Sequence, residues 1–262
     1  MLAIYKKEMR SYFINAVGYV YIGVFMALAA LIFCYTTFQA NSYSTSSYFQ
    51  YIIFAMIVLI PLLTMRMFSE ERKMRTEQLL LTSPVTIFGM VMGKFCAALT
   101  LFVGSLALSC INFIPLYSVA ASEIAAKKAS GDWLKGDHIG PNTAQVWGSL
   151  IGIALIGAAF IAIGLFVSSL TENQLSAAVI TIGVLLTMVI LNLLSQAGSD
   201  EEGTRLVTSY AVRYVLDWFS VLSRFSNFGY GMLDWSALVY YVSLTFIFLY
   251  LTVRVYERRR WA

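Results

Sequence analysis

The side chains of this sequence that could take part in chemistry lie mainly outside its long apolar runs. The densest group in the first half of the chain is in Phe68–Val85, where Glu70, Glu71, Arg72 and Glu77 stand between two apolar segments. Such charges favour ion pairs with a water-soluble partner. The alternative is a solvated surface beside a membrane, which only sets the orientation of the chain.

Catalytic chemistry has few candidates in this sequence. There is one histidine, His138, in a polar stretch, and no H-E-x-x-H motif. The three cysteines lie in apolar segments, and their spacing does not suit a metal site. No G-x-x-x-x-G-K-[ST] motif for nucleotide phosphates occurs. We therefore expect no catalytic, cofactor-binding or metal-binding residue in this chain, and no nucleic-acid partner.

Composition indicates a membrane protein. Hydrophobic residues make up 59% of the chain and charged residues 12%, about half the charged fraction of soluble domains. A span requires roughly 20 apolar residues, so a chain of 262 residues accommodates six spans and their loops. We predict an all-α polytopic membrane protein, with a single transmembrane domain over residues 1–262.

The apolar runs predict six spans, at about residues 17–38, 48–65, 95–116, 143–170, 175–194 and 236–253. Residues 1–15 predict a helix in the membrane interface, because apolar residues recur there at helical spacing, at Leu2, Tyr5, Met9 and Tyr12. A signal peptide is the alternative for this start. The apolar run continues to Phe38, however, which is long enough to span.

The segment Phe68–Val85 predicts a short amphipathic helix between spans 2 and 3. Ser69 is a candidate N-cap, which would place Glu70 and Glu71 in the first turn, where acidic side chains suit the helix dipole. The apolar triplet Leu79, Leu80 and Leu81 would anchor this helix at the membrane surface.

Polar residues within the apolar runs are few. We expect Lys94, near the start of span 3, to extend its ammonium to the surface, because a lysine at the bilayer centre costs about 3 kcal/mol. Ser83 and Pro84 predict the N-cap and the first position of the helix that contains span 3. Pro115 should bend or end that span. Asn112 and Asn192 are candidates for lining a transport path, although hydrogen bonding between helices is the more frequent role.

Span 4 carries small residues every fourth position, which lets another helix approach closely. These are Gly148, Gly152, Ala154, Ala158 and Ala162. Packing within the chain is the favoured interpretation, and dimerisation is the alternative. After this span, Ser169 and Glu172 fit a capping box that would start span 5.

Two polar segments are expected on the opposite side from Phe68–Val85. Ser122–Asn142 predicts a polar loop. Within Gln196–Trp235, apolar residues of Val207–Leu222 recur at helical spacing and predict an amphipathic extracytoplasmic helix, too polar to span. Whether it rests on the membrane or dips into it stays open.

Basic residues predict the orientation. Six spans place both termini on one side, together with twelve of the eighteen basic residues. These are Lys6, Lys7, Arg10, Arg66, Arg72, Lys73, Arg75, Lys94, Arg254, Arg258, Arg259 and Arg260. The positive-inside rule then predicts that both termini and Phe68–Val85 are cytoplasmic.

The run Glu70-Glu71-Arg72 and the run Thr76-Glu77-Gln78-Leu79-Leu80-Leu81-Thr82-Ser83-Pro84-Val85 resemble the loop after the second span of ABC-2-type transporter permeases. The likeness is to type V exporter-like permeases, and within them to the gliding-motility-type branch. Many relatives carry Gly-Thr-(apolar)-Glu where this chain has Arg75-Thr76-Glu77-Gln78. The resemblance implies that Phe68–Val85 is a coupling helix, which docks on a separate ATP-hydrolysing subunit.

The resemblance also implies partners and a place in the cell. The residues expected to dock the ATPase are Glu70, Glu71, Arg72, Glu77, Leu79, Leu80, Leu81 and Glu172. ATP and Mg²⁺ would be bound by that ATPase. The permease would be an exporter in a prokaryotic cytoplasmic membrane, acting as a homodimer or with a similar permease, and an extracytoplasmic accessory protein could join it.

Two other functions remain open from the sequence. One is a non-transporting membrane anchor or sensor for an ATPase or an envelope complex. The other is a secondary carrier. The carrier is the weaker alternative, because ion coupling usually needs ionisable groups inside the spans, and here Lys94 is the sole candidate.

Overall fold

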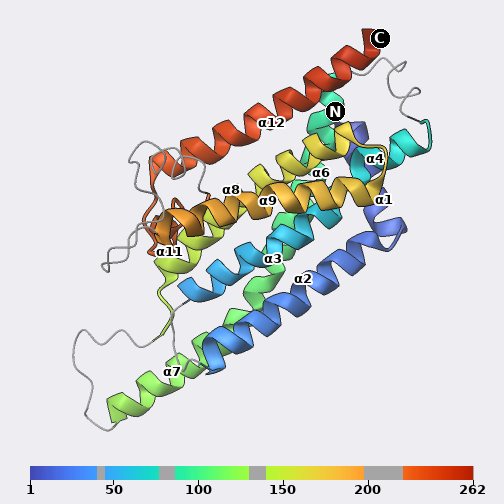
Figure 1. Ribbon diagram of the computed structural model, residues 1–262. Helices are drawn as coiled ribbons and strands as arrows, with labels where there is room; N and C mark the ends of the chain where they lie inside the picture. The colour runs from blue at the N-terminus through green and yellow to red at the C-terminus, as the bar shows by residue number, and fades with distance from the viewer. Residues whose placement is uncertain (40–44, 77–85, 130–139, 198–220, 262) are drawn as a thin grey trace.

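The computed structural model describes residues 1–39, 45–76, 86–129, 140–197 and 221–261, and each regular element among them is helical (Figure 1). Six of these helices are long and apolar enough to cross a membrane. They are Val17–Thr37, Ser46–Lys73, Ile87–Lys128, Thr143–Leu170, Gln174–Asn192 and Trp235–Arg260. The predicted all-α polytopic fold is confirmed.

The helices form one elongated bundle around α8 (Thr143–Leu170). This helix packs against α3 (Ser46–Thr64), α6 (Ile87–Ser109), α9 (Gln174–Ala197) and α12 (Trp235–Trp261). Two thirds of its span is buried by these neighbours, compared with 28% for the last span. Because α8 touches most of the bundle, its side chains set how closely the other spans approach.

Both chain termini lie at the same end of the bundle (Figure 1). That end also holds α1 (Leu2–Ile14) and α4 (Arg66–Lys73), and we call it the α4 end. The opposite end holds α7 (Phe113–Ala129) and α11 (Ser226–Gly229).

The small residues of α8 are used for packing inside the chain. A Cβ added at Gly148 would lie 2.8 Å from the carbonyl oxygen of Phe228 in α11, and one at Gly152 would lie 3.0 Å from the Phe228 side chain. A Cβ added at Gly157 would lie closer still to the ring of Phe102 in α6. Only glycine fits at such contacts, so the internal role expected for Gly148 and Gly152 is the one that the structure shows.

The fourth span agrees with its predicted bounds, but the connection after it does not. The capping box is wrong, because Ser169 lies inside α8 and its hydroxyl donates to the Phe166 carbonyl at 2.6 Å. The side chain that caps α9 belongs to Asn173, whose oxygen accepts the N–H of Leu175 at 3.0 Å. The helix α8 thus continues past Ser169, and the turn is shorter than predicted.

The third span is interrupted once. α6 passes through a 3₁₀ turn, η2 (Cys110–Asn112), into α7. A proline clashes with the carbonyl four residues earlier, so Pro115 accounts for a change of helix type at Ile111. The helix then continues to Ala129, and the loop predicted over Ser122–Asn142 is wrong in its first third, while residues 130–139 lie outside the described part of the chain.

The N-terminal helix packs on α6 as well as facing outward. Its buried residues Ile4 and Tyr12 are spaced by eight, with Glu8 midway between them. Leu2, which was expected on the apolar stripe, is 70% exposed. Tyr12 of the same stripe is buried, and Tyr5 and Met9 pack against the core. The position of α1 in the membrane interface stays a prediction. Through the left-handed Ala16 (φ 55°), α1 leads into α2 (Val17–Phe33) and then into the π-helical turn η1 (Cys34–Gln39).

The last span is longer than predicted, because α12 continues through the terminal arginines to Trp261. Before it, residues 198–220 lie outside the described residues, so the amphipathic helix predicted over Val207–Leu222 is untested save at its last two positions, which form a turn. That turn is fixed to α12, since the hydroxyl of Tyr241 donates to the Val221 carbonyl at 2.7 Å.

Candidate functional site

The helix α4 is a direct continuation of the second span. Met65, which links α3 to α4, has helical backbone angles. Residues Ser46–Lys73 therefore form one continuous helix of 28 residues. At 1.5 Å per residue this helix is about 42 Å long, and the hydrocarbon core of a bilayer is about 30 Å thick. A helix of this length that stands along the bilayer normal extends beyond the hydrocarbon, and the charged residues of α4 identify the part that does so.

The predicted N-cap at Ser69 is wrong. Ser69 is fully buried inside the continuous helix, and its hydroxyl donates to the Met65 carbonyl one turn earlier. Serine commonly forms this bond within a helix. Glu70 and Glu71 consequently lie in the last turn of the continuous helix, which ends at Lys73, rather than in the first turn of a new one.

The helix α4 ends in a Schellman motif. The N–H of Thr76 donates to the Glu71 carbonyl at 3.0 Å, and the N–H of Arg75 donates to the Arg72 carbonyl at 3.1 Å. Arg75 adopts the left-handed conformation (φ 56°) that this motif requires and that glycine adopts most easily. Residues 77–85 follow outside the described residues.

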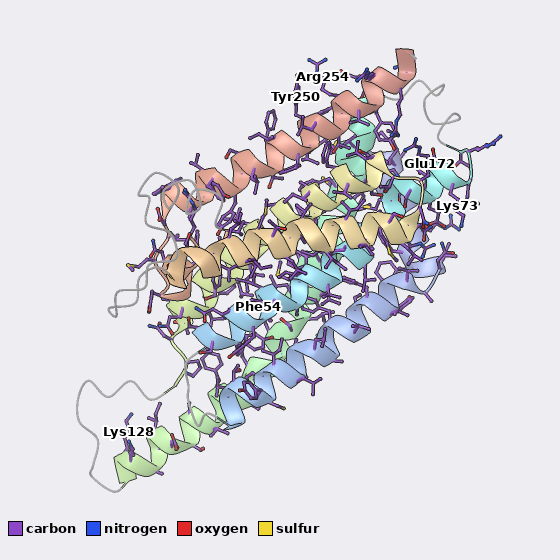
Figure 2. The ribbon with its side chains drawn as sticks, viewed as in Figure 1. Phe54, Lys73, Lys128, Glu172, Tyr250 and Arg254 are labelled. Carbon is purple, nitrogen blue, oxygen red and sulfur yellow. The ribbon has the colours of Figure 1, made fainter. Side chains whose placement is uncertain are left out.

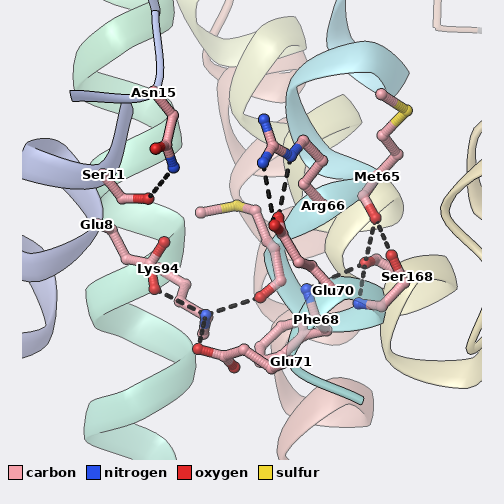
Figure 3. A network of polar contacts seen from close by, with 12 residues as sticks. Glu8, Ser11, Asn15, Met65, Arg66, Phe68, Glu70, Glu71, Lys94 and Ser168 are labelled. Atoms are coloured by element: carbon pink, nitrogen blue, oxygen red, sulfur yellow. Dashed lines mark hydrogen bonds and ion pairs between the residues drawn. The ribbon is translucent and has the colours of Figure 1, made fainter. Parts of the chain in front are cut away.

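Lys94 is the centre of a buried ionic cluster (Figure 3). Its ammonium lies 2.8 Å from Glu8 Oε1 of α1 and 2.9 Å from Glu71 Oε1 of α4. It also donates to the Met67 carbonyl at 2.7 Å. The Lys94 side chain is 1% exposed. The prediction that it extends to the surface is therefore wrong, because partners inside the bundle hold it.

These contacts satisfy the three N–H donors of the ammonium. The ring of Phe68 adds a cation–π contact, with its centre 5.1 Å from Lys94 Nζ. A buried ion pair adds little net stability, because both charges lose their water, but removing one partner leaves an expensive buried charge. The cluster therefore holds α1, α4 and α6 in one relative arrangement.

Glu71 has a second cation beside it. Lys7 of α1 lies 3.2 Å from Glu71 Oε1, and its side chain is 59% exposed. Glu70, the neighbouring acid, is held within its own helix, where it accepts two bonds from the Arg66 guanidinium at 2.9 and 3.0 Å. Both carboxylates thus have partners within this chain.

The end of α8 contacts α4 through Ser168. Its hydroxyl oxygen lies 3.2 and 3.3 Å from the backbone nitrogens of Phe68 and Ser69, which donate to it, and it donates to the Met65 carbonyl at 3.2 Å. This side chain is fully buried. One hydroxyl therefore joins the end of the fourth span to the helix that extends the second.

Arg72 extends this connection to the turn after α8. Its guanidinium donates to the Leu170 carbonyl at 3.0 Å and pairs with Glu172 at 2.8 Å. Glu172 is 69% exposed, and an exposed pair of this kind contributes little stability. The contacts nevertheless fix the position of Arg72 against the α8–α9 turn.

The last span completes the arrangement. The rings of Phe68 and Tyr256 of α12 lie 4.9 Å apart, and Arg259 donates to the Ser169 carbonyl of α8 at 2.7 Å. We use the name α4 junction for the residues that join α4 to α1, α6, α8 and α12. They are Glu8, Phe68, Glu71, Arg72, Lys94, Ser168 and Tyr256.

The residues predicted to dock an ATPase are partly brought together. Glu70, Glu71, Arg72 and Glu172 all lie at the α4 end. Beside them, Lys73, Met74 and Arg75 are exposed, and Figure 2 shows Lys73 and Glu172 at this end. The other predicted residues lie outside the described part of the chain: Glu77, Leu79, Leu80 and Leu81. The docking role itself stays a prediction.

The two asparagines lie apart from the α4 junction. Asn112 is in the η2 turn, and Asn192 is 2% exposed near the end of α9 that is distant from α4. Their role in lining a path stays a prediction.

Sequence reasoning missed Glu8 and Ser168. A signal for Glu8 was present, because a lysine within an apolar run requires a carboxylate partner, and Ile4, Glu8 and Tyr12 share one face of α1. Ser168 gave no such signal, since serines are common at the ends of spans.

Among the described residues, no three His, Cys, Asp or Glu side chains are placed to hold a metal ion.

The profile of the family described as ABC-2 family transporter proteins matches residues 35–256. No curated protein sequence matches the chain. The matched region contains Glu71 and Lys94, while Glu8 precedes it. The gliding-motility-type branch is not distinguished by this match and stays a prediction. Because the match covers most of the sequence and the fold has six candidate spans, this chain belongs to the ABC-2 family of transporter proteins, as a multi-pass permease subunit.

Proposed function

We propose that this chain is the membrane-spanning subunit of an exporter, driven by a separate ABC ATPase that docks on residues 68–85 and binds ATP and Mg²⁺. Two copies, or this chain with a similar permease, form the transport path. The chain lies in a prokaryotic cytoplasmic membrane, with both termini and the α4 end in the cytoplasm. The gathering of basic residues at that end supports this orientation.

The α4 junction is the observation that carries the proposal. α4 is continuous with the second span and contacts α1, α6, α8 and α12 through the residues described above. Packed helices move as rigid elements rather than deforming continuously. A displacement of α4 by a partner in the water is therefore passed to four helices at once.

The exposed residues of the α4 end and the buried ones are assigned different roles. Lys73, Met74 and Arg75 face the solvent, and Glu172 is 69% exposed. We assign the contact with the ATPase to this exposed set and to the segment that follows it. Glu71 is 16% exposed and pairs with Lys94, so it transmits the displacement of α4 to α6 rather than contacting the ATPase.

The test is ATP hydrolysis by the complex of this chain and its ATPase in lipid nanodiscs. Glu71→Gln keeps the side-chain volume but removes the charge that faces Lys94. We expect the ATPase to remain bound, while the stimulation of hydrolysis by the permease falls about fivefold or more, the range of typical coupling energies.

The matched control is Glu123→Gln, an exposed position in α7 at the opposite end of the bundle. Stimulation should be unchanged in this variant. If the complex that contains the Glu71→Gln permease hydrolyses ATP with the stimulation of the wild type, the Glu71–Lys94 pair does not couple the two subunits.

A further inference from the structure

An apolar groove runs along the outside of the bundle between α6 and α12, with α8 as its floor. Its volume is about 370 Å³. Residues that line it include Phe88, Leu99, Ala158, Val242, Leu249 and Val253. Thr245 also lines the groove. Its hydroxyl donates its hydrogen to the Tyr241 carbonyl at 2.8 Å, so it does not donate to a molecule in the groove. An apolar groove of this kind does not hold ordered water.

The length of the groove matches one leaflet of a bilayer. It extends from Phe88 to Leu99 along α6 and from Val242 to Val253 along α12. With a helical rise of 1.5 Å per residue, each wall is roughly 16 Å long. Half of a hydrocarbon core of about 30 Å is about 15 Å. The groove is therefore about as long as one leaflet is thick, and its α6 wall begins at the α4 end of the bundle.

A cationic group stands at the mouth of the groove. Tyr250 lines the groove, and its hydroxyl accepts a bond from Arg254 Nε at 2.7 Å (Figure 2). Arg254 also donates to the carboxylate of Glu257 at 2.9 Å, and its side chain is 61% exposed. A guanidinium has five N–H donors, and these contacts account for two. Arg258 follows one turn later on the same face.

We propose that this groove binds an acyl chain of an anionic phospholipid from the leaflet at the α4 end, with the lipid phosphate at Arg254. The apolar walls exclude water and accept the chain, and the guanidinium pairs with the phosphate, for which its planar donors are suited. This site requires only that the chain spans a membrane, and it does not depend on the proposed ATPase.

The test is native mass spectrometry of the full chain, equilibrated in detergent with equal amounts of phosphatidylglycerol and phosphatidylcholine that carry the same acyl chains. The wild type should retain one lipid, with phosphatidylglycerol preferred about fivefold, which corresponds to about 1 kcal/mol for an arginine beside an anionic lipid. Arg254→Gln should bring this preference close to one. The matched control, Arg10→Gln at an exposed position of α1, should keep it.

The acyl-chain site is tested with a variant that fills the groove. Ala158→Phe on the floor should abolish retention of both lipids, whereas Val179→Phe, at a position of α9 that is 68% exposed, should retain them. Val242→Phe on the α12 wall, at a half-exposed position, serves if Ala158→Phe does not fold. Circular dichroism establishes folding in each case.

Three results would overturn the proposal. The first is equal lipid retention in the groove-filling variants and in Val179→Phe. The second is an unchanged headgroup preference in Arg254→Gln. The third is a dimer that the groove-filling variants disrupt without a change in bound lipid, which would assign the groove to a second copy of the chain.

Discussion

Lys94 of α6 and Glu71 of α4 form an ion pair of 2.9 Å within the bundle. The sequence suggested two separate roles, a lysine that reaches the surface and an acid that contacts another protein. The structure joins them, and Glu8 of α1 completes the cluster at 2.8 Å from the same ammonium. The residues that extend from the membrane are thereby connected to the residues that cross it.

Loss of the Lys94 ammonium should destabilise the protein. Lys94→Met keeps an apolar stem of similar length but leaves Glu8 and Glu71 without their buried cation. We expect a loss of about 3 kcal/mol in the free energy of unfolding, measured as a lower Tm in detergent. Lys73→Met, at an exposed position of α4, is the control and should change stability by less than about 0.5 kcal/mol. Equal Tm values for the two variants would contradict the structural role of the cluster.

The contact between Gly157 and Phe102 predicts a second effect on stability. Gly157→Ala places a methyl group against the buried Phe102 ring, and we expect a loss of about 1–3 kcal/mol from overpacking. Gly183→Ala is the control, because nothing lies within 4 Å of its added Cβ. Both variants gain the same helix propensity, so the difference between their thermal midpoints isolates the packing term. A Gly157→Ala variant as stable as Gly183→Ala would show that α6 and α8 are less close than described.

The left-handed conformation of Arg75 predicts a stabilising substitution. Glycine avoids the cost of about 1–2 kcal/mol that a side chain incurs there, so Arg75→Gly should raise the Tm. The control is Lys73→Gly in the preceding helical turn, which should lower stability by about 1 kcal/mol. If both substitutions lower the Tm alike, α4 does not end in the Schellman motif.

The proposed orientation predicts the location of two fusion points. Green fluorescent protein fused after Ala262 should fluoresce, because it folds in the cytoplasm, and alkaline phosphatase fused there should be inactive. Alkaline phosphatase fused after Lys128, at the opposite end of the bundle, should be active. The reverse pattern would place the α4 end outside the cell and remove the basis for docking an ATPase there.

The sequence predicted the spans well because each is a long apolar run, and length and hydropathy suffice to identify one. The fourth span, Thr143–Leu170, has the predicted bounds. The boundary at Ser69 failed for a local reason. A serine before two glutamates has the pattern of an N-cap, but no glycine or proline interrupts the helix between Thr64 and Ser69. The preference of serine for an N-cap position is weak, and the tertiary packing that buries a continuous helix overrides it.

The α4 junction was beyond sequence reasoning for a different reason. Its members come from five segments, and Lys94 meets Glu8 over a separation of 86 residues. The cost of burying a lysine indicates that a partner exists, but the charges of α1 and α4 offered several carboxylates, and only the packed fold selects Glu8 and Glu71.

The most direct test of the central claim is co-purification with an ABC ATPase. The tagged chain, co-expressed with a candidate ABC ATPase, is purified from detergent as the wild type and as a Lys73→Glu, Arg75→Glu double variant. A Lys127→Glu, Lys128→Glu double variant, which reverses two exposed charges of α7, is the control. We predict that the wild type and the control retain the ATPase and that the α4 variant loses it. An ATPase that never accompanies the wild type, or that stays bound to the α4 variant, would contradict docking at α4.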